Sequence, residues 1–280
     1  MFISYKIFIM KKIITPILFL LLVMSCEEDV LKNKIDDSAD ALEVINDYTI
    51  INQVFQDVGN TTADAIFNAE TTINGKISTV KEDPVITIEP LDFTTFPKTI
   101  TIDFQSGTLG SDGVTRKGIV TVVSTNWYGK DDSEHTTTFS DYYHDDYKVE
   151  GTHYTKNLGE NEDDNLEFSV KVTDGKITSS TTGESITFTS DSKRTWVSGA
   201  DTPLNIWDDE YKLEGSHSGT GSNDVDYTMS TTEALHFVLS PRSVKSGILS
   251  LSVGNINNIE LNYNTSTVTI LGVTFPVPQI

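Results

Sequence analysis

The sequence contains a single cysteine, Cys26, which directly follows a run of apolar residues. A thiol can act as a nucleophile or accept a covalent modification, but one thiol alone cannot form a disulfide within the chain. The folded domain must therefore be held together by its hydrophobic core. What Cys26 can do chemically depends on the residues on either side of it.

The residues before Cys26 have the order of a secretory signal. Lys11 and Lys12 precede an apolar stretch over residues 13–23, and small Ser25 stands directly before the cysteine. This stretch is too short for a membrane-spanning helix, which needs about 20 apolar residues, but it has the length and flanks of a signal peptide. We therefore predict that residues 1–25 are a signal peptide. Because the chain from Met10 contains every part of such a signal, we expect Met10 to be the true start.

Residues 22–25, Leu-Val-Met-Ser, together with Cys26 resemble a bacterial lipobox. The resemblance implies diacylglyceryl transfer to the Cys26 thiol, cleavage before it, and acylation of the new amino terminus. The acids that follow, Glu27, Glu28 and Asp29, resemble the export signal of surface lipoproteins in the Bacteroidota. The chain is thus similar to Bacteroidota lipoproteins of unknown function, and the resemblance implies an outer-membrane lipoprotein at the cell surface. The alternative is a free cysteine in an ordinary signal peptide.

The charge of the chain excludes one class of partner. The 280 residues carry a net charge of −21, with 20 Lys and Arg against 41 Asp and Glu. Without residues 1–25, which hold three lysines and no acid, the net charge is −24. Nucleic acid is excluded as a partner because proteins bind it by neutralising phosphates with Lys and Arg. We expect the membrane to be a partner through the lipid anchor, with a glycan or another protein as the candidate ligand.

Histidines and acids are the residues that could hold a metal or catalyse hydrolysis. His153 and His217 occupy equivalent places in a repeated motif and could meet, with Asp145 or Asp208, around a metal. The alternative is that all five histidines are ordinary strand residues. Paired carboxylates could hydrolyse glycosides, but 41 acids make such pairs uninformative. The sequence has no H-E-x-x-H, G-x-S-x-G, P-loop or dinucleotide motif, so we predict no catalytic residue and lean towards a protein that is not an enzyme.

An acidic segment over residues 160–164 is the candidate calcium loop. Its oxygen ligands stand at short spacing, which calcium tolerates, but the spacing lacks the EF-hand pattern. A solvated hairpin tip is the alternative that we favour. We predict no other metal or cofactor.

Aromatic residues beside acids and amides could bind a sugar. Ring faces of this kind stack on sugar rings while the neighbouring polar groups bind hydroxyls, although large aromatic residues more often cap the core of a sheet. The candidate stacking residues are Trp127, Tyr128, Tyr142, Tyr143 and Trp207.

The elements that would position these residues begin with a tether and a helix. Residues 26–38 are polar and read as a flexible tether, in which Ser38 is a candidate O-glycosylation site or a helix cap. Residues 39–70 predict a helix, because one stripe of small and apolar residues recurs at steps of three and four. Gly59 and Asn60 could divide it in two. The stripe either packs on the protein's own sheet, which we favour, or binds a partner. It consists of Val44, Tyr48, Ile51, Phe55, Val58, Thr62, Ala65 and Ala69.

Residues 71–280 predict one large antiparallel β domain. Apolar residues alternate with polar ones, and Thr, Val and Ile dominate, as in strands with one wet face. We place turns at residues 112–113, 174–175, 182–183 and 254–255. About a dozen strands are too many for a flat open sheet, so the fold class is mainly β with a sandwich, barrel-like or curved-meander form.

One motif occurs twice in the β domain. Residues 147–153, Tyr-Lys-Val-Glu-Gly-Thr-His, return as residues 211–217, Tyr-Lys-Leu-Glu-Gly-Ser-His. We interpret the pair as a duplicated β-unit. The tyrosine, the Val or Leu, the glycine and the histidine should share one face of each strand. The glycine should mark a bulge or a close approach of backbones.

Together these features predict a lipid-anchored envelope protein that acts as a binding or structural module, with glycan as one candidate ligand. Two alternatives remain open: a carrier of an apolar ligand inside a curved sheet, and a glycoside hydrolase that uses two carboxylates.

Overall fold

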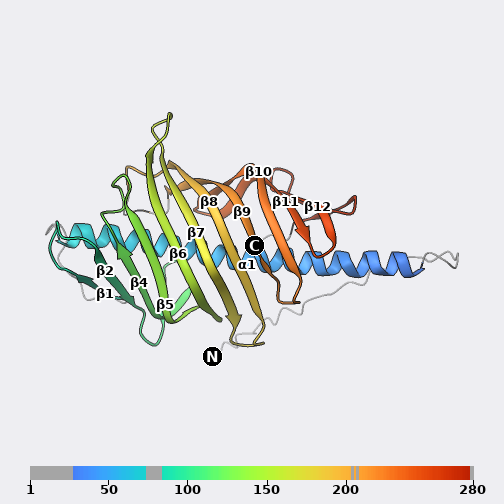
Figure 1. Ribbon diagram of the computed structural model, residues 1–280, viewed down its shortest axis with the longest axis horizontal. Coiled ribbons are helices and arrows are strands. Elements are labelled where there is room, and N and C mark those ends of the chain that lie inside the picture. The colour runs from blue at the N-terminus through green and yellow to red at the C-terminus, as the bar shows by residue number, and fades with distance from the viewer. Residues whose placement is uncertain (1–27, 74–83, 203–204, 206–207, 278–280) are drawn as a thin grey trace, which may run out of the picture.

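The computed structural model describes residues 28–73, 84–202, 205 and 208–277. These residues form one helix and one antiparallel sheet of 14 strands (Figure 1). Each strand of the sheet pairs with the next one along the chain, except that β3 lies off this path and pairs only with β4. The structure thus confirms a mainly β domain with an N-terminal helix, and the sheet is an open meander.

The helix α1 spans Glu28–Ile73. The strands are Val85–Glu89 (β1), Lys98–Asp103 (β2), Thr108–Leu109 (β3), Thr115–Ser124 (β4), Glu134–His144 (β5), Tyr147–Glu160 (β6), Leu166–Ser179 (β7), Ser185–Ser198 (β8), Glu210–Thr220 (β9), Asp226–Leu239 (β10), Arg242–Val253 (β11), Ile256–Asn262 (β12), Thr267–Ile270 (β13) and Val273–Pro276 (β14).

Helix α1 begins earlier than the sequence pattern indicated. The predicted tether over residues 26–38 is helical from Glu28, so Ser38 lies inside the helix and does not cap its start. Residues 28–58 contain neither glycine nor proline, so nothing in them interrupts a helix that tertiary packing stabilises further along. The helix also continues through Gly59. No helix in the described part of the chain is long and apolar enough to cross a membrane.

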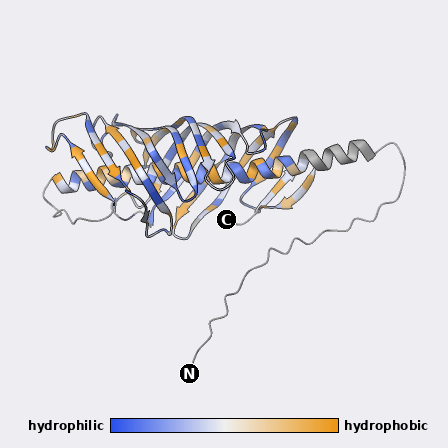
Figure 2. Ribbon diagram, turned by 90° about the horizontal axis from the view of Figure 1, so that it is seen from below, coloured by the Kyte–Doolittle hydropathy of each residue, from blue (hydrophilic) through white to orange (hydrophobic). Residues whose placement is uncertain are grey.

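The predicted stripe of α1 packs on the sheet of the same chain. All eight of its residues are buried, from Val44 to Ala69. The opposite side of the helix is covered too, because only Asn46 and Asn68 are exposed between residues 44 and 69. Figure 2 shows the reason: the sheet curves around the helix, with strands on both sides of it.

Aromatic rings make many of the contacts between the helix and the curved sheet. Tyr48 packs edge-on against Tyr227 of β10, with ring centroids 6.2 Å apart. Phe55 stacks on Phe188 of β8 at 5.7 Å. Gly59 has no side chain, and the His153 ring of β6 takes up that space: a Cβ at Gly59 would lie 3.3 Å from its Nε2. The core therefore lies between the helix and the concave face of the sheet.

Irregular pairings on four consecutive strands help the sheet to curve. The register shifts at Gly118 of β4, Asp141 of β5, Gly151 of β6 and Asp174 of β7, and each of these residues has a positive φ. Such bulges bend a strand and increase its twist. The turn predicted at residues 174–175 is one of these bulges, since β7 continues through it to Ser179.

The two copies of the repeated motif lie in β6 and β9. Val149 and Leu213 are buried, as are His153 and His217, so each histidine lies on the inner face as predicted. Gly151 is at a bulge, and a Cβ there would lie 2.6 Å from the Asp174 carbonyl oxygen. Gly215 pairs regularly with β8, but a Cβ there would lie 2.6 Å from Ser192 Cα, so this glycine marks a close approach.

Candidate functional site

A cavity of about 320 Å³ lies between α1 and the later strands of the sheet. It is lined by residues of the helix, of strands β8–β11, and by Tyr263, Ser266 and Val277 near the end of the described chain. Its volume is at the lower end of the range that small-molecule sites occupy, roughly 300–1,000 Å³. We call it the helix–sheet cavity.

The helix supplies a polar wall. Apart from the adjacent pair Asn52 and Gln53, the residues of this wall recur at steps of three and four, like the apolar stripe, and therefore form a second stripe along a neighbouring face of α1. They are mainly amides, which both donate and accept hydrogen bonds. The wall consists of Asn46, Thr49, Asn52, Gln53, Gln56 and Asn60. The spacing of this stripe is visible in the sequence, but amides at helical spacing are equally typical of a solvated face, so only the apolar stripe carried a prediction.

The sheet supplies an apolar wall. These residues come from β9, β10 and β11, whose inner faces turn towards the helix. They are Tyr211, Leu213, Phe237, Val238, Leu239 and Val244. A surface that is apolar on one side and rich in amides on the other suits a ligand that has both an apolar part and groups that hydrogen-bond.

Two phenols stand at the cavity between these walls. The Tyr48 hydroxyl is buried and has no hydrogen-bond partner among the described residues, and burial raises the pKa of this phenol well above its usual value of 10. Burial likewise raises the pKa of Tyr263 to about 12. Both hydroxyls therefore keep their protons at neutral pH.

Arg194 of β8 is the one cation among the described lining residues, and it is only 4% exposed. Its Nη2 donates to the Tyr128 hydroxyl at 2.7 Å, and its Nη1 donates to Asn60 Oδ1 at 3.4 Å. The guanidinium also lies over the Tyr211 ring, 4.3 Å from its centroid. None of the described lining residues is a histidine, cysteine or carboxylic acid, so this surface favours binding over acid–base catalysis.

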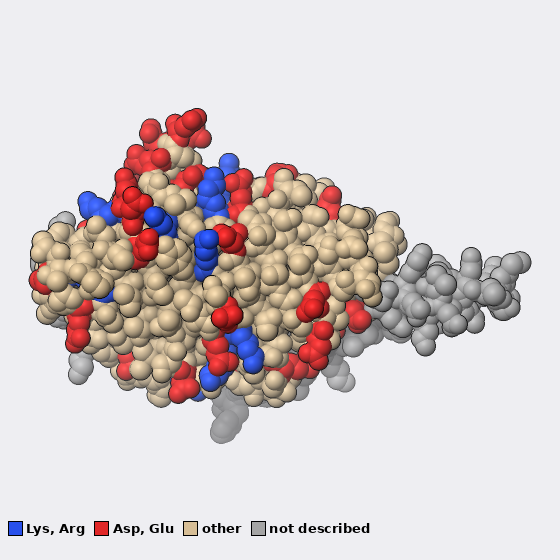
Figure 3. All heavy atoms as spheres, viewed as in Figure 1, with Lys and Arg blue, Asp and Glu red and all other residues tan. Residues whose placement is uncertain are grey.

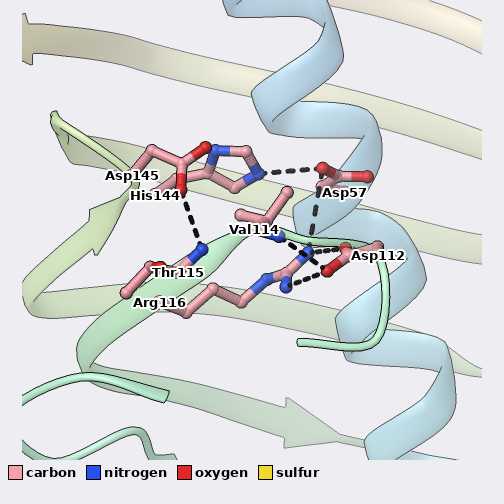
Figure 4. A network of polar contacts seen from close by, with 7 residues as sticks. All are labelled: Asp57, Asp112, Val114, Thr115, Arg116, His144 and Asp145. Carbon is pink, nitrogen blue, oxygen red and sulfur yellow. Dashed lines mark hydrogen bonds and ion pairs between the residues drawn. The ribbon is translucent and has the colours of Figure 1, made fainter. Parts of the chain in front are cut away.

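A second polar cluster joins another face of α1 to the sheet (Figure 4). Asp57 Oδ2 lies 2.8 Å from His144 Nε2 of β5 and 3.8 Å from Arg116 Nη2 of β4. Arg116 also binds both oxygens of Asp112, at 3.1 and 2.6 Å. Burial, and then the charge of Arg116, lower the pKa of His144 to about 4. The neutral imidazole donates to Asp57, so the cluster fastens the helix to β4 and β5.

A serine–histidine contact in the core resembles part of a catalytic site but lacks its other parts. Ser124 Oγ contacts His135 Nδ1, and Ser133 Oγ lies 3.1 Å from His135 Nε2. All three residues are at most 1% exposed, so a substrate cannot reach the hydroxyls. Burial lowers the pKa of His135 to about 4. Hydroxyls occupy both ring nitrogens, where a catalytic triad would have a carboxylate on one of them.

The candidate stacking residues do not form a common surface. Trp127, Tyr128 and Tyr142 are buried, with at most 3% of each exposed. They cap the core, which is the alternative that the sequence left open for these rings. Tyr143 lies on the outer side of β5, where Lys117 Nζ sits 4.0 Å from its ring centroid. Trp207 lies outside the described residues.

Each buried ring has a structural role of its own. Trp127 packs against Phe96 at 5.1 Å, beside the buried Lys98. Tyr142 stacks on Phe139 at 5.5 Å. Tyr128 stacks on Phe168 at 4.9 Å and accepts the hydrogen bond from Arg194. Of the predicted sugar-binding residues, Tyr128 is therefore the one that connects to the helix–sheet cavity, through Arg194.

The remaining predicted sites lie apart from the cavity. Cys26 and Glu27 are outside the described residues, and Glu28 and Asp29 begin α1. The acidic segment 160–164 forms the tip between β6 and β7, and acids gather on this protruding hairpin in Figure 3. Within the described residues no group of three or more His, Cys, Asp or Glu side chains could hold a metal. His153 and His217 do not meet, because β7 and β8 separate their strands.

Comparisons with protein-family models, with curated proteins and with solved structures found no match to this chain.

Proposed function

We propose that this chain is an exported, lipid-anchored protein of the cell envelope whose folded domain binds a small amphipathic molecule in the helix–sheet cavity. The observation that carries the binding function is the cavity itself, with its apolar wall from β9–β11 and its amide wall from α1. This corresponds to the carrier alternative from the sequence. We set glycan binding aside because three of the five rings that favoured it, Trp127, Tyr128 and Tyr142, are in the core.

The anchoring part of the proposal has its support in the sequence. An apolar run, Ser25, Cys26 and three acids follow one another as they do in surface lipoproteins. Stable anchoring needs at least two acyl chains, since one chain binds a membrane only weakly and reversibly. Lipidation of Cys26 would meet this requirement, and the outer membrane is the location that we propose.

The anchor is tested by membrane fractionation of cells that express the full chain. Wild type should sediment with membranes, whereas Cys26→Ser should appear in the soluble fraction. Ser25→Ala serves as the control because it retains the thiol. Sedimentation of Cys26→Ser equal to that of wild type would refute lipidation at this residue.

The binding site is tested by filling the cavity. Val244→Trp adds a large side chain to the apolar wall, whereas Val123→Trp adds the same side chain at a position on β4 that is 41% exposed. We expect wild type and Val123→Trp to enhance the fluorescence of anilinonaphthalene sulfonate, a probe with apolar rings and one anionic group. Val244→Trp should not enhance the fluorescence of the probe. Cooperative melting of this variant would show that it is folded. Equal fluorescence with all three proteins would contradict binding in this cavity.

A further inference from the structure

The charges around the helix–sheet cavity point to a more specific ligand. The chain as a whole has about twice as many acids as bases, 41 against 20. The described residues that line the cavity reverse this balance, with one arginine and no acid. The acidic chain as a whole attracts cations, whereas the lining of the helix–sheet cavity, with its one arginine, attracts anions.

Arg194 is a buried cation whose hydrogen-bonding capacity is incompletely used. Its Nε is buried and has no partner among the described residues, and the bond from Nη1 to Asn60 is long, at 3.4 Å. A guanidinium cannot lose its proton in a protein, so the charge remains. Burying a charge without a hydrogen-bonded counterion is unfavourable.

Asp209, which directly precedes β9, is an acid that acts on Arg194 electrostatically. Its carboxylate has other partners, however: Oδ1 accepts from Trp196 Nε1 at 3.1 Å and Oδ2 accepts from the Tyr211 hydroxyl at 2.7 Å. No ion pair within 4.0 Å joins Arg194 to a carboxylate in the described part of the chain. Arg194 therefore lines the cavity as a cation without a carboxylate counterion of its own in the described part of the chain.

We propose, building on the binding function proposed above, that the ligand of the helix–sheet cavity is an amphiphile with a carboxylate head group, which Arg194 binds. The apolar tail lies along Leu213, Phe237 and Val244, and the amides of α1 solvate the head. A carboxylate fits better than a phosphate monoester because the cavity offers one cation and neutral donors, whereas a dianion would need more positive charge.

The head group is tested by isothermal calorimetry with decanoate, decanol and decylammonium, which share a tail and differ in charge. Each is used below its micelle concentration. Wild type should bind decanoate at least about tenfold more tightly than decanol, as expected for a charge-assisted hydrogen bond, and decylammonium most weakly. Arg194→Gln should lose this preference while it still binds decanol. Lys193→Gln, which removes the same charge from the neighbouring outward-facing position, should keep it.

A measurement on wild type covers the case in which Arg194→Gln does not fold. The Nε–H resonance of Arg194 should shift in NMR spectra when decanoate is added and should move much less with decanol. Equal affinity of wild type for decanoate and decanol, or an unmoved Arg194 resonance, overturns the carboxylate proposal and leaves the binding function standing. If none of the three probes binds wild type, the proposed binding function itself fails.

Discussion

His217 connects acidity to stability in a way that one substitution can isolate. It lies on β9 with 3% of its surface exposed, stacked on Phe188 and edge-on to Tyr48. Neither ring nitrogen has a hydrogen-bond partner among the described residues. Burial therefore lowers the pKa of His217 from its usual 6.5 to about 4, because a charged imidazole would have no partner at this place.

The sign of the effect follows from where each state takes up its proton. As the pH falls through 6.5, the unfolded chain protonates this histidine and the folded chain does not. The contribution of neutral, buried His217 to the unfolding free energy is thus complete above pH 6.5 and is lost as the pH falls towards about 4. From about pH 6.5 to about pH 5 only the unfolded chain binds this proton. This span of about 1.5 pH units corresponds to a loss of about 2 kcal/mol of unfolding free energy.

The perturbation is His217→Leu, which removes the titrating group and retains an apolar side chain. Urea unfolding of wild type and of the variant is measured at about pH 7.5 and about pH 5. Whatever the substitution does to packing at the higher pH, wild type should lose about 2 kcal/mol more than the variant on acidification. Taking the difference between the two pH values cancels any packing change that does not depend on pH.

The matched control is Phe188→Leu, since Phe188 stacks on His217 but does not titrate. Relative to wild type, this variant should have an unfolding free energy that is lower by the same amount at both pH values. If His217→Leu and wild type lose the same free energy between the two pH values, the reasoning that burial keeps His217 neutral is wrong.

Three further outcomes are expected from other parts of the fold. Wild type should lose stability from about pH 6.5 to about pH 5 in urea unfolding, because His135 and His153 also have lowered pKa values; Asp64, whose pKa burial raises to about 7, acts in the opposite direction but is outnumbered. Gly151→Val should lower the unfolding free energy by about 1–3 kcal/mol, because φ of Gly151 is 110° and the Asp174 carbonyl would meet the new Cβ. The control Gly129→Ala, where a Cβ would have open space, should melt within a degree or two of wild type. Equal melting of both variants would contradict the bulge argument. Asp57→Ala should cost about 1–3 kcal/mol because it leaves the His144 Nε2–H without its acceptor, whereas Asp57→Asn keeps an acceptor and should cost less; equal losses in chemical denaturation would show that this hydrogen bond is unimportant.

Local patterns in the sequence predicted most elements of this fold, although α1 begins earlier than its apolar stripe indicated. The stripe from Val44 to Ala69 predicted the buried face of α1, and period-two alternation predicted strands such as β8, whose residues alternate between buried and more exposed. The repeated motif predicted that His153 and His217 share the inner face with their neighbours. These features depend on the geometry of one helix or one strand, which residues a few positions apart determine.

The site depended on contacts that no local pattern contains. Alternation distinguishes two faces of a strand, but which rings become core depends on how the sheet bends, and so Trp127 and Tyr142 are buried although they stand beside acidic turns. The bulge at Asp174 looked like a turn because aspartate and glycine adopt a positive φ in both settings.

The helix and strands and the acidic balance of the chain could be predicted without a structure, since each is a property of nearby residues or of composition. The export signal is also read from nearby residues, and it stays a prediction. The position of the cavity and the charge that faces it depend instead on residues far apart in the chain. Arg194 and Asn60 are 134 positions apart, and they meet because the sheet wraps the helix and brings β8 against its polar stripe. The Arg194 guanidinium gives the cavity its charge, and it is buried because the sheet curves around α1.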